Sequence, residues 1–95
     1  AALKRLGDRT EVFLDSGIRS GQDVLKALAL GAKGTFIGRS YLHGLGAMGQ
    51  AGVTKALEVI HAELDTSMAL CGAQKATDLG REHVLVPRDF EGEWV

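Results

Sequence analysis

Two short apolar segments on either side of one amphipathic helix constrain the fold of this chain more than any other feature. Residues 12–14 and 35–37 are short, rich in β-branched and aromatic residues, and bounded by polar residues and glycine. This pattern predicts strands that are buried on both faces. Because a helix of about ten residues separates them, the strands are expected to run parallel, which places the chain in the α/β class.

The helix between the two segments has a recognisable start and end. Ser20 and Asp23 have the spacing of a capping box, in which each residue satisfies a backbone N–H group of the other. Gly31 is a typical helix-ending residue and predicts where this helix stops. A separate helix end is predicted at Gly7, before the first strand.

A second helix is predicted near the end of the chain, after a glycine-rich connection over residues 44–52. Five apolar residues recur at spacings of three or four, which is the helical period: Val53, Leu57, Ile60, Leu64 and Met68. This helix is predicted to end at Gly72. Its acidic residues are interpreted as a solvated face: Glu58, Glu63 and Asp65. Met48 is interpreted as a core residue, and Cys71, the only cysteine, as a small buried one.

Composition excludes several classes of function. The 95 residues suffice for one domain, residues 1–95, and 11 Lys and Arg against 12 Asp and Glu give a net charge of −1. A nearly neutral chain has no basic surface for nucleic acid, and no histidine or cysteine spacing predicts a metal site. No apolar run approaches the ~20 residues that span a bilayer. We therefore expect a cytoplasmic protein, with peripheral attachment to a membrane left open.

Both predicted strands are followed by glycine and arginine, a combination that suits a phosphate group. Ligands of parallel α/β folds lie at the carboxyl ends of the strands. Glycine lets backbone N–H groups approach a phosphate, a helix start favours the anion, and a guanidinium pairs with two oxygens at once. Gly17, Arg19 and Gly21 follow the first strand, and Gly38 and Arg39 follow the second. The alternative interpretation is two surface arginines beside turn glycines.

A second glycine motif, G-x-G-x-x-G over residues 44–49, matches the spacing of the dinucleotide fingerprint. That fingerprint must follow its strand directly, and residues 40–43 intervene here. We therefore interpret these glycines as packing positions next to the last helix.

The stretch VFLDSGIRSGQDVLKALALGAKGTFIGR, continued through GLGAMGQAGVTKALEVIHAELDTSMALCGA, resembles the carboxyl-terminal part of the FMN-dependent α-hydroxy-acid dehydrogenases and oxidases. This family includes glycolate oxidase, L-lactate dehydrogenase and mandelate dehydrogenase, and the resemblance covers about residues 2–84. It implies a TIM (β/α)8 barrel, of which this chain is the last two strand–helix units, with FMN as cofactor. It also implies the residues that contact FMN: Asp15, Ser16, Gly17, Ile18, Arg19, Gly38 and Arg39.

Within that set, the resemblance implies that Asp15 meets the ribityl hydroxyls, while the two arginines and Gly17 and Gly38 take the phosphate. Ser16 stands where many oxidases of the family have glycine, and this variant is more similar to the bacterial lactate dehydrogenases.

The resemblance further implies oxidation of an L-2-hydroxy acid, lactate- or glycolate-like, to the 2-oxo acid by a homo-oligomeric, tetrameric enzyme. The family's catalytic histidine and its substrate-binding arginine lie upstream of the matching stretch. His43, His61 and His83 lie outside the family's histidine motif, so no residue here is assigned as catalytic, and the electron acceptor stays open. The alternatives are another phosphate-binding barrel, such as one similar to inosine-monophosphate dehydrogenase, and a non-catalytic remnant.

Overall fold

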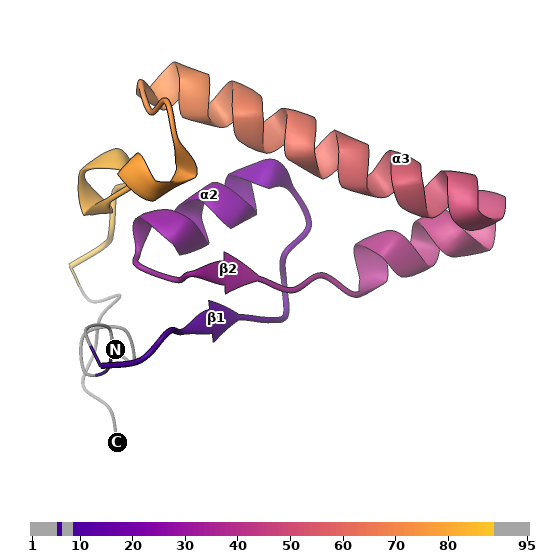
Figure 1. The fold of residues 1–95 in the computed structure, drawn as a ribbon, viewed down its shortest axis with the longest axis horizontal. Helices are drawn as coiled ribbons and strands as arrows, with labels where there is room; N and C mark the ends of the chain where they lie inside the picture. Colours follow the sequence, from indigo (N-terminus) through magenta and orange to yellow (C-terminus); the bar gives the residue numbers. More distant parts are fainter. Residues whose placement is uncertain (1–5, 7–8, 89–95) are drawn as a thin grey trace.

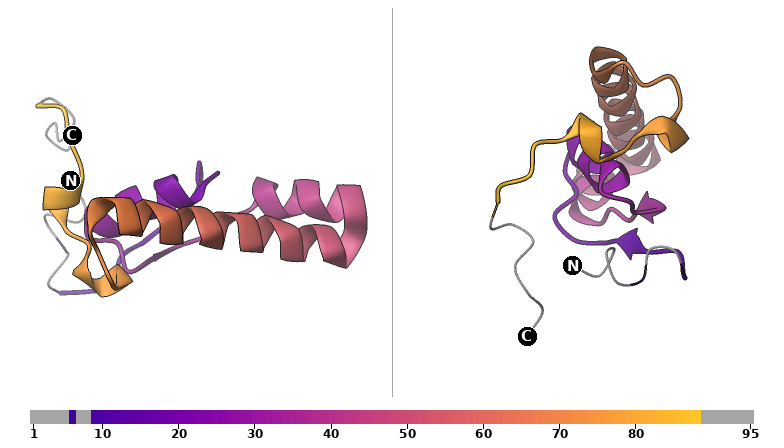
Figure 2. Two further views of the ribbon diagram at one scale, coloured as in Figure 1. Left: turned by 90° about the horizontal axis from the view of Figure 1, so that it is seen from above. Right: turned by 90° about the vertical axis from the view of Figure 1, so that its left-hand side faces the viewer.

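The computed structural model describes residue 6 and residues 9–88 of the chain, and the helix end predicted at Gly7 lies outside them. The elements follow in the order β1 (Phe13–Leu14), α2 (Gly21–Ala29), β2 (Gly34–Thr35), α3 (Arg39–Cys71), η1 (Ala76–Asp78) and η2 (Arg81–His83). The strands lie on one side of α2 and the long second part of α3 lies on the other (Figure 1). The end view in Figure 2 shows the same order of layers.

The two strands pair in parallel, as predicted, with Phe13 opposite Gly34 and Leu14 opposite Thr35. The described residues do not bury both faces of the strands, because Phe13 is 51% exposed and Phe36, just after β2, is 58% exposed. The two aromatic rings contact each other, with 5.8 Å between their centroids, on a surface that the described residues leave largely open. Strands become buried on both faces only where other elements cover both faces. In the described part of the chain, α2 packs against β2 and covers one face of the sheet.

Helix α2 begins and ends where the sequence predicts. The Ser20 hydroxyl accepts a hydrogen bond from the Asp23 N–H group, with 3.2 Å between the N and Oγ atoms. The other half of the capping box differs, because the Asp23 carboxylate accepts from the N–H group of Arg19 at 2.9 Å. Gly31 has a φ of 113° and ends the helix with a hydrogen bond from its N–H group to the Leu28 carbonyl. Three buried apolar residues of α2 form half of the core among the described residues: Leu25, Ala27 and Ala29.

The connection predicted over residues 44–52 is helical, which corrects the sequence-based expectation. Helix α3 begins 14 residues before the predicted start at Val53, and its backbone leaves the helical region only at Met48 and Gly49. Gly49 has a φ of 61°, which glycine adopts without strain, and the chain reverses there. Figure 1 shows a short arm before this turn and a long arm after it, side by side. The predicted helix end at Gly72 is confirmed by its left-handed backbone, with a φ of 79°.

Gly44 and Gly52 explain how the two arms of α3 approach each other. A Cβ atom on Gly52 would collide with the backbone of Gly44, and one on Gly44 would collide with the backbone of Gly52. Gly44 and Gly52 therefore serve helix packing. The packing role predicted for the G-x-G-x-x-G motif is confirmed for Gly44, whereas a Cβ atom on Gly46 or Gly49 would meet nothing within 4 Å.

Two side chains interpreted as buried are exposed instead. Met48 is 60% exposed because it lies at the reversal between the arms of α3, outside the core. Cys71 is exposed at the last residue of α3, on the rim of a cavity. The apolar character of a residue does not show whether other elements of the fold cover it.

We expect Gly52→Ala to lower the free energy of unfolding by about 1–3 kcal/mol, because its methyl group would push the two arms of α3 apart. Denaturant titration of the complete protein measures this change. The matched control is Gly46→Ala, since a Cβ atom on Gly46 would meet nothing within 4 Å. Alanine is the better helix former, so the control should raise the free energy of unfolding by about 0.5–1 kcal/mol. Equal effects of the two substitutions would contradict the packing role of Gly52.

Candidate cofactor-binding site

The loops that follow β1 and β2 leave the sheet at the same edge, because the two strands are parallel. Residues 15–20 lead from β1 into α2, and residues 36–38 lead from β2 into α3. Ser40, in the first turn of α3, donates a long hydrogen bond to the carbonyl of Ile18, with 3.5 Å between the two oxygens. The structure therefore brings the two glycine- and arginine-containing segments together, as the sequence predicts.

The loop after β1 turns sharply at Ser16 and Gly17. Their φ angles are 76° and 79°, in the left-handed region. Glycine adopts this conformation without strain, whereas it costs other residues roughly 1–2 kcal/mol. The Asp15 carboxylate supports the turn, because its Oδ1 accepts a hydrogen bond from the Ser16 N–H group at 2.8 Å. This backbone conformation gives a physical reason for the glycine that many oxidases of the similar family have at the position of Ser16.

Hydrogen-bond donors are accessible along this edge. Among the described residues, the N–H groups of Gly17 and Gly38 have no acceptor, and a Cβ atom on either glycine would meet nothing within 4 Å. Arg19 and Arg39 are exposed, and in the described part of the chain neither guanidinium has an acceptor or a carboxylate partner. Approachable N–H groups and planar guanidinium donors fit the chemistry of a phosphate.

Two parts of the predicted phosphate site differ in the structure: the Ile18 side chain and the start of α2. The Ile18 side chain is buried, so only the backbone of this residue is available at the edge. The start of α2 is already occupied, because the Gly21 N–H group donates to Oε1 of Glu63, with 3.2 Å between N and O. Glu63 is exposed, in keeping with the predicted solvated face, but its carboxylate makes this contact, which the sequence does not predict. A separation of 42 residues leaves no local signal from which it could have been found.

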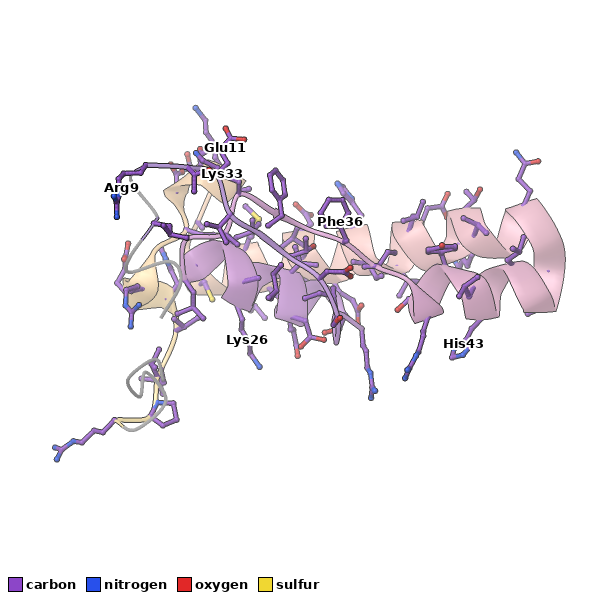
Figure 3. The ribbon with its side chains drawn as sticks, turned by 90° about the horizontal axis from the view of Figure 1, so that it is seen from below. Arg9, Glu11, Lys26, Lys33, Phe36 and His43 are labelled. Carbon is purple, nitrogen blue, oxygen red and sulfur yellow. The ribbon has the colours of Figure 1, made fainter. Side chains whose placement is uncertain are left out.

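His43 lies in the short arm of α3, one helical turn after Arg39 and on the same face of that helix. Its side chain projects on the side of the molecule opposite to Phe36 (Figure 3). His83 belongs to η2, where its Nδ1 accepts a hydrogen bond from the Gly80 N–H group at 3.1 Å. A cavity of about 600 Å³ lies between α2, the end of α3 and residues 83–87, and none of the seven predicted FMN-contact residues lines it.

Among the described residues, no three His, Cys, Asp or Glu side chains are grouped so that they could hold a metal ion. None of the described helices combines the length and the apolar character needed to cross a membrane.

Comparison with known proteins gives one consistent family. The chain matches the family described as FMN-dependent dehydrogenase over residues 1–86. It is 47% identical over 90 residues to pre-mycofactocin synthase from Mycobacterium tuberculosis, covering 95% of this chain and 23% of that protein. It is 45% identical over 90 residues to glycolate oxidase from Spinacia oleracea, covering 95% of this chain and 24% of that protein.

The chain is also similar to a solved structure that binds flavin. The recombinant flavin-binding domain of baker's yeast flavocytochrome b2 is 39% identical and superimposes with a TM-score of 0.79, over 92% of this chain and 25% of that one. This chain thus spans about a quarter of the length of the proteins it matches. The match over residues 1–86, together with these identities, shows that the chain belongs to the FMN-dependent dehydrogenase family.

Proposed function

We propose that this chain supplies the FMN-phosphate-binding part of an enzyme that oxidises an L-2-hydroxy acid to the 2-oxo acid. One observation carries the proposal: two loops at one sheet edge present N–H and guanidinium groups that have no partner among the described residues, in a member of the FMN-dependent dehydrogenase family. In the complete protein, the two strand–helix units are the last two of a (β/α)8 barrel. The open surface at Phe13 and Phe36 supports this placement, because barrel strands have neighbours on every side.

In this proposal, different residues at the sheet edge contact different parts of FMN. The N–H groups of Gly17 and Gly38 and the guanidinium groups of Arg19 and Arg39 hold the phosphate, which is doubly charged near neutral pH. Asp15 uses Oδ1 within the turn, so Oδ2 is left to accept a hydrogen bond from a ribityl hydroxyl. FMN, when bound, takes up the two electrons that leave the substrate. No residue of this chain is proposed as the base that removes the substrate's hydroxyl proton.

The substrate in this proposal is a small 2-hydroxy acid of the lactate or glycolate kind. The identities to a pre-mycofactocin synthase and to a glycolate oxidase are nearly equal, at 47% and 45%. This near-equality supports a role of this part of the chain in holding the shared cofactor rather than in selecting the substrate. A homo-oligomeric state and a cytoplasmic location, free or attached to a membrane surface, stay predictions.

The test is an anaerobic flavin titration of the complete protein. We expect a yellow protein that releases FMN on denaturation and whose flavin absorbance is bleached by L-lactate or glycolate. Propionate and acetate, which lack the hydroxyl group, should leave the absorbance unchanged. A protein that takes up no FMN would refute the cofactor assignment. FMN that no 2-hydroxy acid reduces would refute the substrate assignment alone.

A further inference from the structure

We propose that Glu63 is a positioning residue for the loop that binds the FMN phosphate, and that it closes the start of α2 to the phosphate. This inference rests on the function proposed above and extends it to a residue of α3. The inference rests on the hydrogen bond from the Gly21 N–H group in α2 to the Glu63 carboxylate in α3, two residues that are 42 positions apart in the sequence.

The start of α2 lies directly against the backbone of α3. Gly21 is buried, and a Cβ atom on it would collide with the backbone of Glu63 and Leu64. At this close approach the Glu63 side chain reaches the first N–H group of the helix. The loop of residues 15–20 is therefore held at both ends, by strand pairing before it and by the contact between Gly21 and Glu63 after it.

The N–H groups near the start of α2 are mostly in use within the chain. Arg19 donates to Asp23, Gly21 donates to Glu63, and Asp23 donates to the Ser20 hydroxyl. A helix start binds an anion when such groups are free and when no other negative charge faces the helix dipole. Glu63 supplies that negative charge already.

The phosphate is consequently directed to the donors ahead of the helix. The N–H groups of Gly17 and Gly38 have no acceptor among the described residues, and their backbone is open to approach. The position of Gly17 relative to the sheet edge depends on where α2 begins, and the contact between Gly21 and Glu63 sets that point. Glu63 thus acts on the cofactor through the loop, without touching it.

The experiment compares the affinities of the flavin-free complete protein for FMN and for riboflavin, which lacks the phosphate, by fluorescence quenching. We expect Glu63→Ala to weaken FMN binding about tenfold and to leave riboflavin binding within about twofold of the original. Glu63→Gln keeps an acceptor oxygen for Gly21 and should keep FMN binding within about threefold. Glu58→Ala removes the same charge from an exposed position on the same helix and should change neither affinity.

The ratio of the two affinities separates positioning from general destabilisation, because a loosened fold weakens both ligands alike. An unchanged ratio in Glu63→Ala would overturn the inference, and so would tighter FMN binding, which would mean that the phosphate uses the vacated helix start. If Glu63→Ala fails to fold, Glu63→Asp, whose carboxylate falls short of Gly21, should show the same selective loss. Failure of the original protein to bind FMN would instead refute the proposed function.

Discussion

The 95 residues, expressed by themselves, are expected to show no lactate- or glycolate-dependent dye reduction. Oxidation of a 2-hydroxy acid needs a base within hydrogen-bond reach of the substrate hydroxyl, directly or through one water. The family's histidine lies upstream of the matching stretch, and neither of the loops at the sheet edge, residues 15–20 and 36–38, contains a histidine. We therefore expect turnover at the level of a reaction without protein.

The packing of the chain gives an independent reason for the same result. No large side chain among the described residues is fully buried, and several apolar residues are about half exposed: Phe13, Leu14, Phe36, Leu42 and Leu45. Exposed apolar surface of this extent favours association between copies and a loosened fold. Size-exclusion chromatography should show self-associated species. The fluorescence of added FMN should be quenched little or not at all, because little FMN binds.

The complementing experiment adds a separate polypeptide that carries the rest of the barrel. Flavin binding and dye reduction should then return together, because the added strands cover the open sheet surface and the added part brings the base. Dye reduction by the purified 95 residues alone would contradict the prediction. It would direct the search for a base to His43, the histidine that follows β2 most closely.

Arg39→Ala, in the complete protein, is expected to weaken FMN binding by about 1.5–3 kcal/mol, the range for a hydrogen bond to a charged group. This corresponds to roughly a tenfold to 150-fold rise in the dissociation constant. The guanidinium of Arg39 is exposed at the sheet edge without a carboxylate partner among the described residues. Its removal therefore leaves none of the described groups without a partner, and we expect the loss of binding energy to fall on the cofactor. Fluorescence titration with FMN measures the change.

Two variants serve as controls for Arg39. Arg39→Lys should recover only part of the affinity, because an ammonium group is a compact charge and lacks the planar pair of donors. Lys55→Ala removes one positive charge from an exposed position on the same helix and should leave the dissociation constant nearly unchanged. FMN bound to Arg39→Ala with the original affinity would remove this residue from the phosphate site.

The parts of the structure that follow from local sequence signals were predicted from the sequence alone. The Ser20 cap, the glycine ends at Gly31 and Gly72, and the parallel direction of the strands all depend on a few neighbouring residues or on the length of one connection. The candidate site is also a feature that local sequence signals predict. Its glycines and arginines directly follow the two strands, and parallel pairing is enough to bring them to one edge.

The tertiary structure alone decided the features that depend on contacts between distant segments. Glycines that looked like a connection became the close crossing of two helical arms, because Gly44 and Gly52 meet only after the reversal at Gly49. Glu63 reached Gly21 across 42 residues because both lie where α2 and α3 touch. Periodicity and capping describe one segment at a time, whereas burial and long-range hydrogen bonds depend on which segments meet in space. For that reason the sequence predicted that the proposed phosphate-binding groups follow the two strands, and only the fold revealed that the start of α2 is already occupied.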